Sequence, residues 1–359
     1  KRMLTSNEIK KQIDNGTIQI ENMAEDALKK PNSCDLRIGN VLYVFDYEIV
    51  DTKNCKNYLQ EVLNDQISHL RRIVIPETGL LLEPHKVYLT KTVEKVTTNG
   101  YVPVMNGKTM LSLLGVSVEL TNGYKTDHFD DHLLLSIIAS KPTIIYPDIK
   151  IANLAFFPSL KPSNEIRKID DQKSCGLYQS GMLSGTEIQK RMQGDNPDII
   201  ITPQDNIVIN PNSVNLTLND TIAIYSDPVL DMKKENATQK FQIGEDGIWV
   251  YPDEIYLGRT NEWTETNRVV PMMSGRSSLG RNGLHVHCSA GMGSLGYKGY
   301  WHMGIRPVKP LRLIKDMKCC QIYYLTAEGE QDKNYQGYMQ NMSGEQLSSP
   351  LYKSLTKKK

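Results

Sequence analysis

Hydrophobic positions fall in short runs rich in Val, Ile, Leu and Tyr, and turn-forming residues separate the runs. Four examples are "VLYVFDYEIV" (41–50), "KVYLTKTVEKV" (86–96), "HLLLSIIAS" (132–140) and "TIIYPDIKIANLAFF" (143–157). Signals such as "NG", "NDT", "KP" and "YPD" lie between the runs. Short strands at roughly ten-residue spacing are typical of a β sandwich or barrel. The pattern therefore predicts a mostly β protein.

Two segments have a helical signature instead. "MLTSNEIKKQI" begins at Met3 and "MLSGTEIQKRM" begins at Met182. In each, a hydroxyl residue is followed three positions later by a glutamate, as in Thr5 with Glu8 and Ser184 with Glu187. This spacing is the capping box that starts a helix. We expect a few short helices, one near the start of each half of the chain.

The two helical segments belong to an internal repeat. "PNSCDLRI" (31–38) matches "PNSVNLTL" (211–218), and "EPHKVYLTKT" (83–92) matches "YPDEIYLGRT" (251–260). From Val102, which falls on Val270, to Lys150, which falls on Lys318, the offset stays at 168 without a gap. A register held this long indicates two copies of one domain. We expect domains at 1–165 and 182–330, a polar linker at 166–181, and a C-terminal tail at 331–359.

Composition narrows the class of protein. The 359 residues have a formal net charge of +1, so no general electrostatic attraction to DNA, RNA or a membrane surface is expected. No run approaches the roughly 18 apolar residues that a spanning helix needs. The cysteines form no C-x-x-C pair, which favours reduced thiols and a cytoplasmic protein. The same absence excludes a zinc nucleobase deaminase. The cysteines are Cys34, Cys55, Cys175, Cys288, Cys319 and Cys320.

The stretch "SGRSSLGRNGLHVH" (274–287) concentrates hydrogen-bond donors. Arg276 and Arg281 offer planar forks of N–H groups, Ser277 and Ser278 offer hydroxyls, and Gly275 allows a close backbone approach. Closely spaced donors suit a polyphosphate, whose oxygens accept hydrogen bonds from several directions. A solvated polar turn with structural arginines is the alternative interpretation.

"GRSSLGRNGLHVHCSAG" resembles the signature of the dCTP deaminase branch of the dUTPase-like superfamily. "PNSCDLRIG", "YPDIKIANLAF" and the tail "NYQGYMQ…LSSPLYK" resemble the same family. The resemblance implies distorted β-barrel or jelly-roll domains, a homotrimer, and nucleotides bound at subunit interfaces. It also implies that Mg²⁺ arrives with the triphosphate and that no cofactor is tightly bound. The residues implied to bind nucleotide and phosphates are Arg276, Ser277, Ser278, Arg281, Ala290, Tyr335, Gln336 and Lys353.

The chain departs from the family at the positions that carry catalysis. The family's deaminases use a glutamate as general acid and base, and the corresponding position is Gly304 in the second copy and Ser136 in the first. The family's diphosphatases use an aspartate in a turn, where the second copy has Ser294. In the first copy that position is Thr126, and Asp127 is one residue away, which makes Asp127 a weak catalytic candidate.

The first copy also lacks the donor-rich loop. Lys108, Thr109, Met110 and Leu113 replace the two arginines and two serines of the second copy. The string "GKT" is not a P-loop, because that motif requires glycine where Val102 stands. Asp35 and Arg37 of the first copy, however, retain the "DLR" of the family motif. The second copy thus has the donor-rich loop and the first copy has the "DLR" motif. This distribution is consistent with one site composed from both copies, or with one copy that serves only as a scaffold.

Several other residues have two interpretations. "DHFDDH" (127–132) could hold a metal, but a polar turn between strands is the simpler interpretation, and we expect no metal site. His285 and His287 share a strand face, and His302 could sit on the neighbouring strand. His287 and Trp301 are possible base contacts, the ring of Trp301 by stacking. Ordinary structural roles are the alternative for both.

Two functions follow from these observations. The first is a protein that binds a nucleotide, of dCTP, dUTP or signalling type, without efficient deamination, for sensing or sequestration. The second is an active dCTP deaminase, in which dCTP becomes dUTP and ammonia, with or without dUTP diphosphatase activity. The second function needs a substitute acid, for which the candidates are Asp127, Asp130, Asp131 and Glu119.

Overall fold

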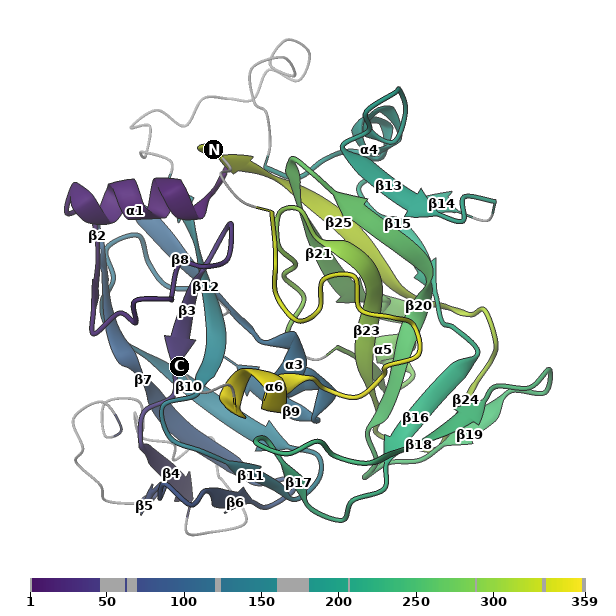
Figure 1. Ribbon diagram of the computed structural model, residues 1–359, viewed down its shortest axis with the longest axis horizontal. Coiled ribbons are helices and arrows are strands. Elements are labelled where there is room, and N and C mark those ends of the chain that lie inside the picture. The colour runs from purple at the N-terminus through teal and green to yellow at the C-terminus, as the bar shows by residue number, and fades with distance from the viewer. Residues whose placement is uncertain are drawn as a thin grey trace.

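Strands dominate the protein, as the pattern predicts. The computed structural model describes residues 2–45, 62, 70–119, 124–159, 181–205, 207–287, 289–330 and 334–356. The linker expected at 166–181 lies outside these ranges except for Gly181. Figure 1 shows the first copy in purple to blue and the second in green to yellow, side by side. None of the described helices is long and apolar enough to cross a membrane.

The first copy is built from one large sheet and two small ones. The large sheet has the order β5-β4-β7-β10-β9, with β2 beside β7, and the others have the orders β3-β12-β8 and β17-β11-β6. The strands of this copy are β1 (Met3–Leu4), β2 (Ile18–Glu21), β3 (Cys34–Arg37), β4 (Val41–Phe45), β5 (Leu70–Val74), β6 (Leu80–Leu82), β7 (Val87–Thr98), β8 (Tyr101–Gly107), β9 (Val116–Glu119), β10 (Asp130–Ala139), β11 (Thr143–Ile145) and β12 (Lys150–Pro158).

The second copy repeats this arrangement. Its large sheet has the order β18-β16-β20-β23-β22 with β13 beside β20, and its smaller sheets join β14, β15, β25 and β21, and β19 with β24. The strands are β13 (Ile199–Thr202), β14 (Val208–Ile209), β15 (Val214–Thr217), β16 (Thr221–Tyr225), β17 (Leu230–Asp231), β18 (Thr238–Gln242), β19 (Ile248–Val250), β20 (Tyr256–Thr266), β21 (Val269–Gly275), β22 (Leu284–Val286), β23 (Lys298–Pro307), β24 (Leu311–Leu313) and β25 (Lys318–Glu328).

The longest strands alternate between buried and less buried side chains. Residues of β7 from Val87 onward follow this period of two, and so do residues of β20 after Gly258. A period of two places one face of each strand on the core and leaves the other accessible. This alternation is the feature of the sequence that specified a barrel-like sheet.

The helices are short and begin where their caps predict. The Thr5 hydroxyl accepts the Glu8 amide of α1 (Ser6–Asp14) at 3.3 Å, and the Ser184 hydroxyl accepts the Glu187 amide of α4 (Gly185–Arg191) at 3.2 Å. Both predicted helix starts are therefore confirmed. The other described helices are α3 (Thr109–Leu113), α5 (Ser277–Arg281) and α6 (Leu351–Thr356).

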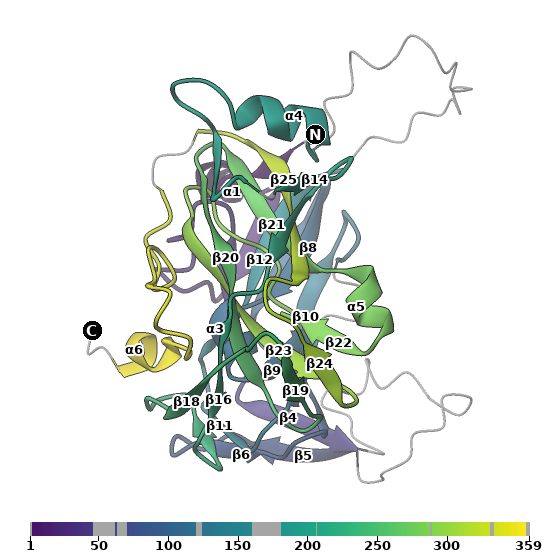
Figure 2. The same ribbon diagram turned by 90° about the vertical axis from the view of Figure 1, so that its right-hand side faces the viewer.

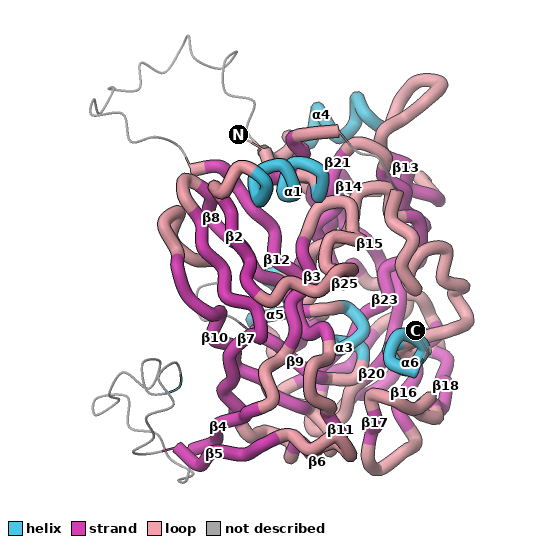
Figure 3. The backbone as a smooth tube through the Cα atoms, turned by 60° about the vertical axis from the view of Figure 1, so that its left-hand side comes forward, coloured by secondary structure: helices cyan, strands magenta, loops and turns pink. Residues whose placement is uncertain are grey.

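The two copies share strands as well as a core. β1 of the first copy pairs in parallel with β25 of the second, and β17 of the second pairs in parallel with β11 of the first. One continuous hydrophobic cluster includes Leu36 and Leu113 from one copy and Leu216 and Met303 from the other. The tail then runs back across both copies to α6 (Figures 1 and 2). The tube in Figure 3 shows α3 between the sheets of the two copies, and Figure 2 shows α5 on the side of the molecule opposite the tail.

Candidate functional site: two cavities on opposite sides of the copy interface

The donor-rich loop of the second copy forms α5 and lies on the surface. No residue from Ser277 to Arg281 is buried. Arg276 donates from Nη1 to the Lys318 carbonyl at 3.3 Å, and Arg281 donates from Nη2 to the Ser277 hydroxyl at 3.5 Å. The first contact anchors Arg276 on the end of β25, while most of its donors remain available. The loop therefore keeps exposed cationic donors.

We call the hollow beside α5 the outer cavity, and its volume is about 480 Å³. This volume falls within the range of small-molecule sites, roughly 300–1,000 Å³. Arg276 and Ser277 line it, whereas Ser278 and Arg281 are not among its described lining residues. The complete described lining is Glu119, Ser274, Gly275, Arg276, Ser277, Gly280, Leu284, His285, Val286, Arg306 and Gln321.

Three polar residues of the outer cavity come from other parts of the sequence. Arg306 lies on β23 and donates from Nη1 to the Ser140 hydroxyl at 3.2 Å. Gln321 lies on β25, and its Oε1 accepts from the Ser213 hydroxyl at 3.3 Å. Glu119, at the end of β9, is an exposed carboxylate of the first copy. The outer cavity thus brings a second arginine and an acid from the first copy to the donor-rich loop.

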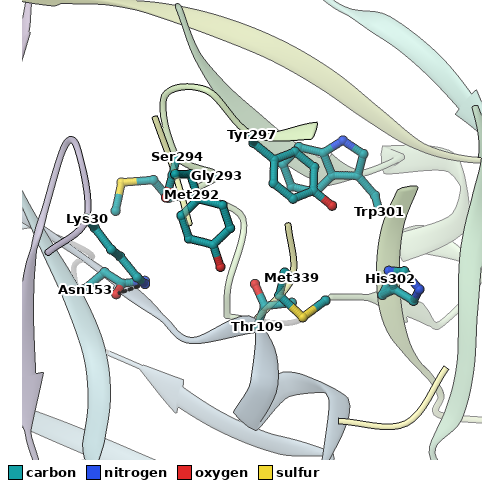
Figure 4. A pocket seen from close by; sticks show the side chains of 11 residues that line it. Lys30, Thr109, Asn153, Met292, Gly293, Ser294, Tyr297, Trp301, His302 and Met339 are labelled. Atoms are coloured by element: carbon teal, nitrogen blue, oxygen red, sulfur yellow. Dashed lines mark hydrogen bonds between the residues drawn. The ribbon is translucent and has the colours of Figure 1, made fainter. Parts of the chain in front are cut away.

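We call the second hollow the inner cavity; it lies between the copies and has a volume of about 50 Å³. Figure 4 shows residues of both copies around it, together with Met339 from the tail. A cavity of this size holds a few water-sized groups but not a nucleotide. Its described lining is Lys30, Thr109, Asn153, Met292, Gly293, Ser294, Tyr297, Trp301, His302, Tyr335 and Met339.

Gly304, at the position of the family's catalytic glutamate, is covered by the first copy. A Cβ at Gly304 would lie 2.5 Å from the Ser112 carbonyl oxygen and 3.2 Å from Ile255 Cδ1. Ser112 belongs to α3, which packs against β23. Because the obstacle is backbone, no small rotamer change makes room for a side chain. The position that would hold the catalytic carboxylate is therefore filled by α3.

The segment after β22 also forms hydrogen bonds with the first copy. The Gly107 amide donates to the Ser289 carbonyl at 2.6 Å, and the Ser289 hydroxyl accepts the Val118 amide at 3.2 Å. Ala290, which the resemblance places among the nucleotide-binding residues, is buried next to these contacts. The main-chain groups at Ser289 are therefore used to join the copies.

Trp301 is part of an aromatic wall and not an exposed platform. Its indole Nε1 donates to the Thr264 hydroxyl at 3.0 Å, and its ring lies 5.1 Å from that of Tyr297, centroid to centroid. Tyr335 of the tail packs 6.1 Å from Tyr297. Burial, opposed by a hydrogen bond from the Met339 amide, raises the pKa of Tyr335 to about 12. Trp301 reaches the inner cavity but not the outer one, as far as the described lining shows.

His287, which follows the end of β22, and His302 of β23 are buried and neutral near pH 7. His285 is exposed, so the prediction that His285 and His287 share a strand face is wrong. Burial lowers the pKa of His287 and of His302 to about 4. His302 donates from Nδ1 to the Tyr300 carbonyl at 3.1 Å, and its Nε2 has no partner among the described residues. His287 has a positive φ of 56°, and neither of its ring nitrogens has a hydrogen-bond partner among these residues. His287 lines neither cavity within the described part of the chain.

The other sequence candidates are dispersed. The Ser159 hydroxyl holds the pKa of the half-buried Asp127 below its usual value, and Asp127 is absent from the described lining of both cavities. Gln336 is exposed, and Lys353 places its Nζ 5.8 Å from the centroid of the Tyr352 ring. Among the described residues, no group of three His, Cys, Asp or Glu side chains could hold a metal ion.

The residues that the sequence assigned to one nucleotide site thus lie at two different cavities in the structure. Arg276 and Ser277 face the outer cavity, whereas Trp301 and Tyr335 face the inner one. Arg306 and Gln321 were missed because they lie on strands far along the chain from the donor-rich loop. The alternation of β23 and β25 could have placed them on a sheet face, but not beside α5.

The fold and these sites define a pair of fused β-barrel domains in which one copy keeps an open donor-rich loop. A family model described as dCTP deaminase-like matches residues 3–159 and again residues 182–327. The chain therefore belongs to the dCTP deaminase-like family, and the resemblance noted from the sequence is confirmed.

Relatives of this chain carry one specific name. Proteins named "dCTP deaminase, dUMP-forming" are 47% identical over 176 residues in Clostridium botulinum (strain Alaska E43 / Type E3) and 46% identical over 167 residues in Hathewaya histolytica. These alignments cover 49% and 46% of this chain but 99% and 95% of the relatives. Each relative is thus about as long as one copy.

A solved structure resembles both copies together. The crystal structure of 2′-deoxycytidine 5′-triphosphate deaminase from Agrobacterium tumefaciens has a TM-score of 0.69 and 15% sequence identity with this chain. The match covers 91% of this chain and 99% of that one. At this identity the similarity shows the fold alone, and it confirms the mostly β fold class.

Proposed function

We propose that this protein binds a pyrimidine deoxynucleoside triphosphate in the outer cavity and does not deaminate it at Gly304. The triphosphate, with any Mg²⁺ it carries, is held by Arg276 and Ser277, and Ser278 and Arg281 approach from the same loop. The observation that carries the proposal is the contrast between the two cavities. The donor-rich loop borders about 480 Å³, whereas α3 fills the position of the family's catalytic glutamate.

Physical chemistry supports the division between binding and catalysis. Arginine forks and hydroxyls match phosphate oxygens, and Arg306 adds a second guanidinium to the same cavity. Loss of a positioned general acid or base typically lowers a rate by about 10²–10⁴-fold. A protein with this loop and without that carboxylate fits sensing or sequestration of a nucleotide better than rapid turnover.

The test combines calorimetry with product analysis. Titration of the full chain with dCTP and with dUTP should show saturable binding, and chromatography should recover the nucleotide unchanged. Arg276→Ala should weaken binding by about 10- to 150-fold, because a hydrogen bond to a charged group contributes about 1.5–3 kcal/mol. Arg276→Lys keeps the positive charge but loses the planar pair of N–H donors, so its affinity should lie between those of wild type and Arg276→Ala. Wild-type affinity in Arg276→Ala would refute the proposal.

One observation favours a second candidate function, which is dCTP deamination with a substitute acid. Glu119 lines the same cavity as Arg276 and Ser277, whereas Asp127, Asp130 and Asp131 are not in its described lining. Robust release of ammonia, together with dUTP or dUMP, from wild-type protein but not from Glu119→Gln would establish this function. The test also decides whether any dUTP diphosphatase activity is present.

We also propose that the tandem chain assembles as a homotrimer. The support is family resemblance together with the position of α5 on the surface, where a neighbouring subunit could approach it. Light scattering on the purified protein tests this assembly, and a mass of one chain, 40.7 kDa, would contradict it.

A further inference from the structure

Charged side chains of the first copy gather beside the inner cavity. The Lys108 Nζ lies 2.6 Å from Asp35 Oδ1, the Lys30 Nζ lies 3.6 Å from the same oxygen, and the Lys150 Nζ lies 3.4 Å from Asp35 Oδ2. Lys150 also lies 2.6 Å from Asp26. Three ammonium groups therefore lie around the buried Asp35 carboxylate, and the half-exposed Asp26 carboxylate forms an ion pair with one of them, that of Lys150.

This cluster has more positive charge than its carboxylates neutralise. Burial alone would raise the pKa of Asp35, but Lys108 and Lys30 outweigh burial and hold that pKa well below its usual value. Burial and then the charge of Lys108 lower the pKa of Lys30 to about 7, although Asp35 acts in the opposite direction. Lys30 is only partly exposed, and it shares the Asp35 carboxylate with Lys108 and Lys150, so an anion beside Lys30 would stabilise its charged form.

Lys30 is the member of the cluster that borders the inner cavity. Its ammonium group donates to Asn153 Oδ1 at 2.6 Å and lies 3.6 Å from Asp35 Oδ1, so one of its three donors remains for a group in the cavity. Figure 4 shows the Lys30 ammonium and the Thr109 hydroxyl on the same side of the cavity. Ser294 and Tyr335 bring further hydroxyl groups to the lining.

The size of the inner cavity restricts what it can hold. At about 10–15 Å³ for one water-sized group, a volume of about 50 Å³ has room for about four such groups. A tetrahedral oxyanion presents four oxygens around one central atom. A nucleoside does not fit beside the aromatic wall of Tyr297 and Trp301.

We propose that the inner cavity is a binding site for a small tetrahedral oxyanion such as phosphate or sulfate, held by Lys30 and Thr109. The site is separate from the nucleotide site proposed for the outer cavity, and it does not depend on that proposal. Its oxyanion neutralises the excess charge of the lysine cluster and stabilises the interface between the two copies.

The experiment measures thermal unfolding and calorimetric titration with sulfate, with chloride at matched ionic strength as the baseline. Sulfate should bind saturably and raise the melting temperature of wild type, and Lys30→Met should weaken binding about tenfold or more. Lys10→Met is the control, because the Lys10 side chain is exposed on α1 and belongs to none of the ion pairs of this cluster. Thr109→Val removes only a hydroxyl and should also weaken binding if Lys30→Met fails to fold.

Further titrations separate this site from the outer cavity. Arg276→Ala should retain the response to sulfate even if it loses the response to dCTP, and orthophosphate should compete with sulfate in both proteins. Equal responses of Lys30→Met, Thr109→Val and wild type, or a response no greater than that to chloride, would overturn the proposal. If sulfate binding depends instead on Arg276, the anion belongs to the outer cavity.

Discussion

Gly304 shows how a single position of this chain departs from the sequence pattern of the family's deaminases. The sequence showed that a carboxylate is missing there, and the structure adds that the Ser112 carbonyl occupies the space. A carboxylate side chain therefore does not fit at position 304 while α3 stays in place. Gly304→Glu should restore no deamination, and it should destabilise the fold.

A smaller change at the same position tests the packing directly. Gly304→Ala places a Cβ 2.5 Å from the Ser112 oxygen and should lower the free energy of unfolding by about 1–3 kcal/mol, the usual cost of overpacking. Gly280→Ala in α5 is the control, because a Cβ there meets no described atom within 4 Å. That substitution should be neutral or stabilising, since alanine favours helix over glycine. Denaturant unfolding measures both, and equal effects would contradict the packing at Gly304.

The two buried histidines, His287 and His302, should make the free energy of unfolding depend on pH. A histidine whose folded pKa is about 4 binds a proton less readily than an unfolded one at about 6.5, so stability should fall as the pH drops from about 6.5 to 4. His302→Asn and His287→Asn should each flatten this dependence by on the order of 3 kcal/mol. Asparagine also tolerates the positive φ of His287. The exposed His285→Asn should leave the dependence unchanged, and urea unfolding at several pH values measures it.

At this scale the sequence identified a cluster of donors but not the residues that lie beside it. Arg276 and Ser277 were identified from local donor density, which needs no tertiary information. Lys108, which stands in the first copy where the second copy has Arg276, is buried in an ion pair with Asp35, because α3 turns into the interface. Arg306 reaches the outer cavity through strand pairing, which no local pattern encodes.

At the scale of elements, α3 and the tail close the inner side of the interface. The Ser349 hydroxyl donates to the Met110 carbonyl at 2.7 Å, and the Tyr225 hydroxyl donates to the Leu113 carbonyl at 3.2 Å. Helix starts and strand alternation were predictable because both depend on local spacing. The docking of α3 on β23 was not, since it depends on the hydrophobic residues that replaced a donor-rich loop.

The contact between the tail and α3 yields a prediction for one hydroxyl. Ser349→Ala leaves the Met110 carbonyl without its partner and should lower the free energy of unfolding by about 1–3 kcal/mol. The adjacent Ser348→Ala, at a half-buried position, should change stability by less than about 0.5 kcal/mol. Chemical denaturation of the two variants compares them. If both behave alike, the tail does not stabilise α3 in this way.

At the scale of the whole molecule, the sequence predicted the repeat, but it did not predict that the two copies share sheets and a hydrophobic core. A constant offset predicts two similar domains, and separate barrels joined by a linker would satisfy it equally. The structure instead places β17 in a sheet with β11 and β1 beside β25. It also places Leu113 and Met303 in one hydrophobic cluster.

Because strands and core are shared, the two copies should unfold together. Calorimetry of the full chain should show one transition whose calorimetric and van't Hoff enthalpies agree, since separating the copies would expose the apolar face of α3 and unpair β17. Residues 1–165 and 182–359 expressed separately should be unstable alone but should associate when expressed together. Two resolved transitions, or halves that fold independently and do not bind each other, would mean that the interface contributes little.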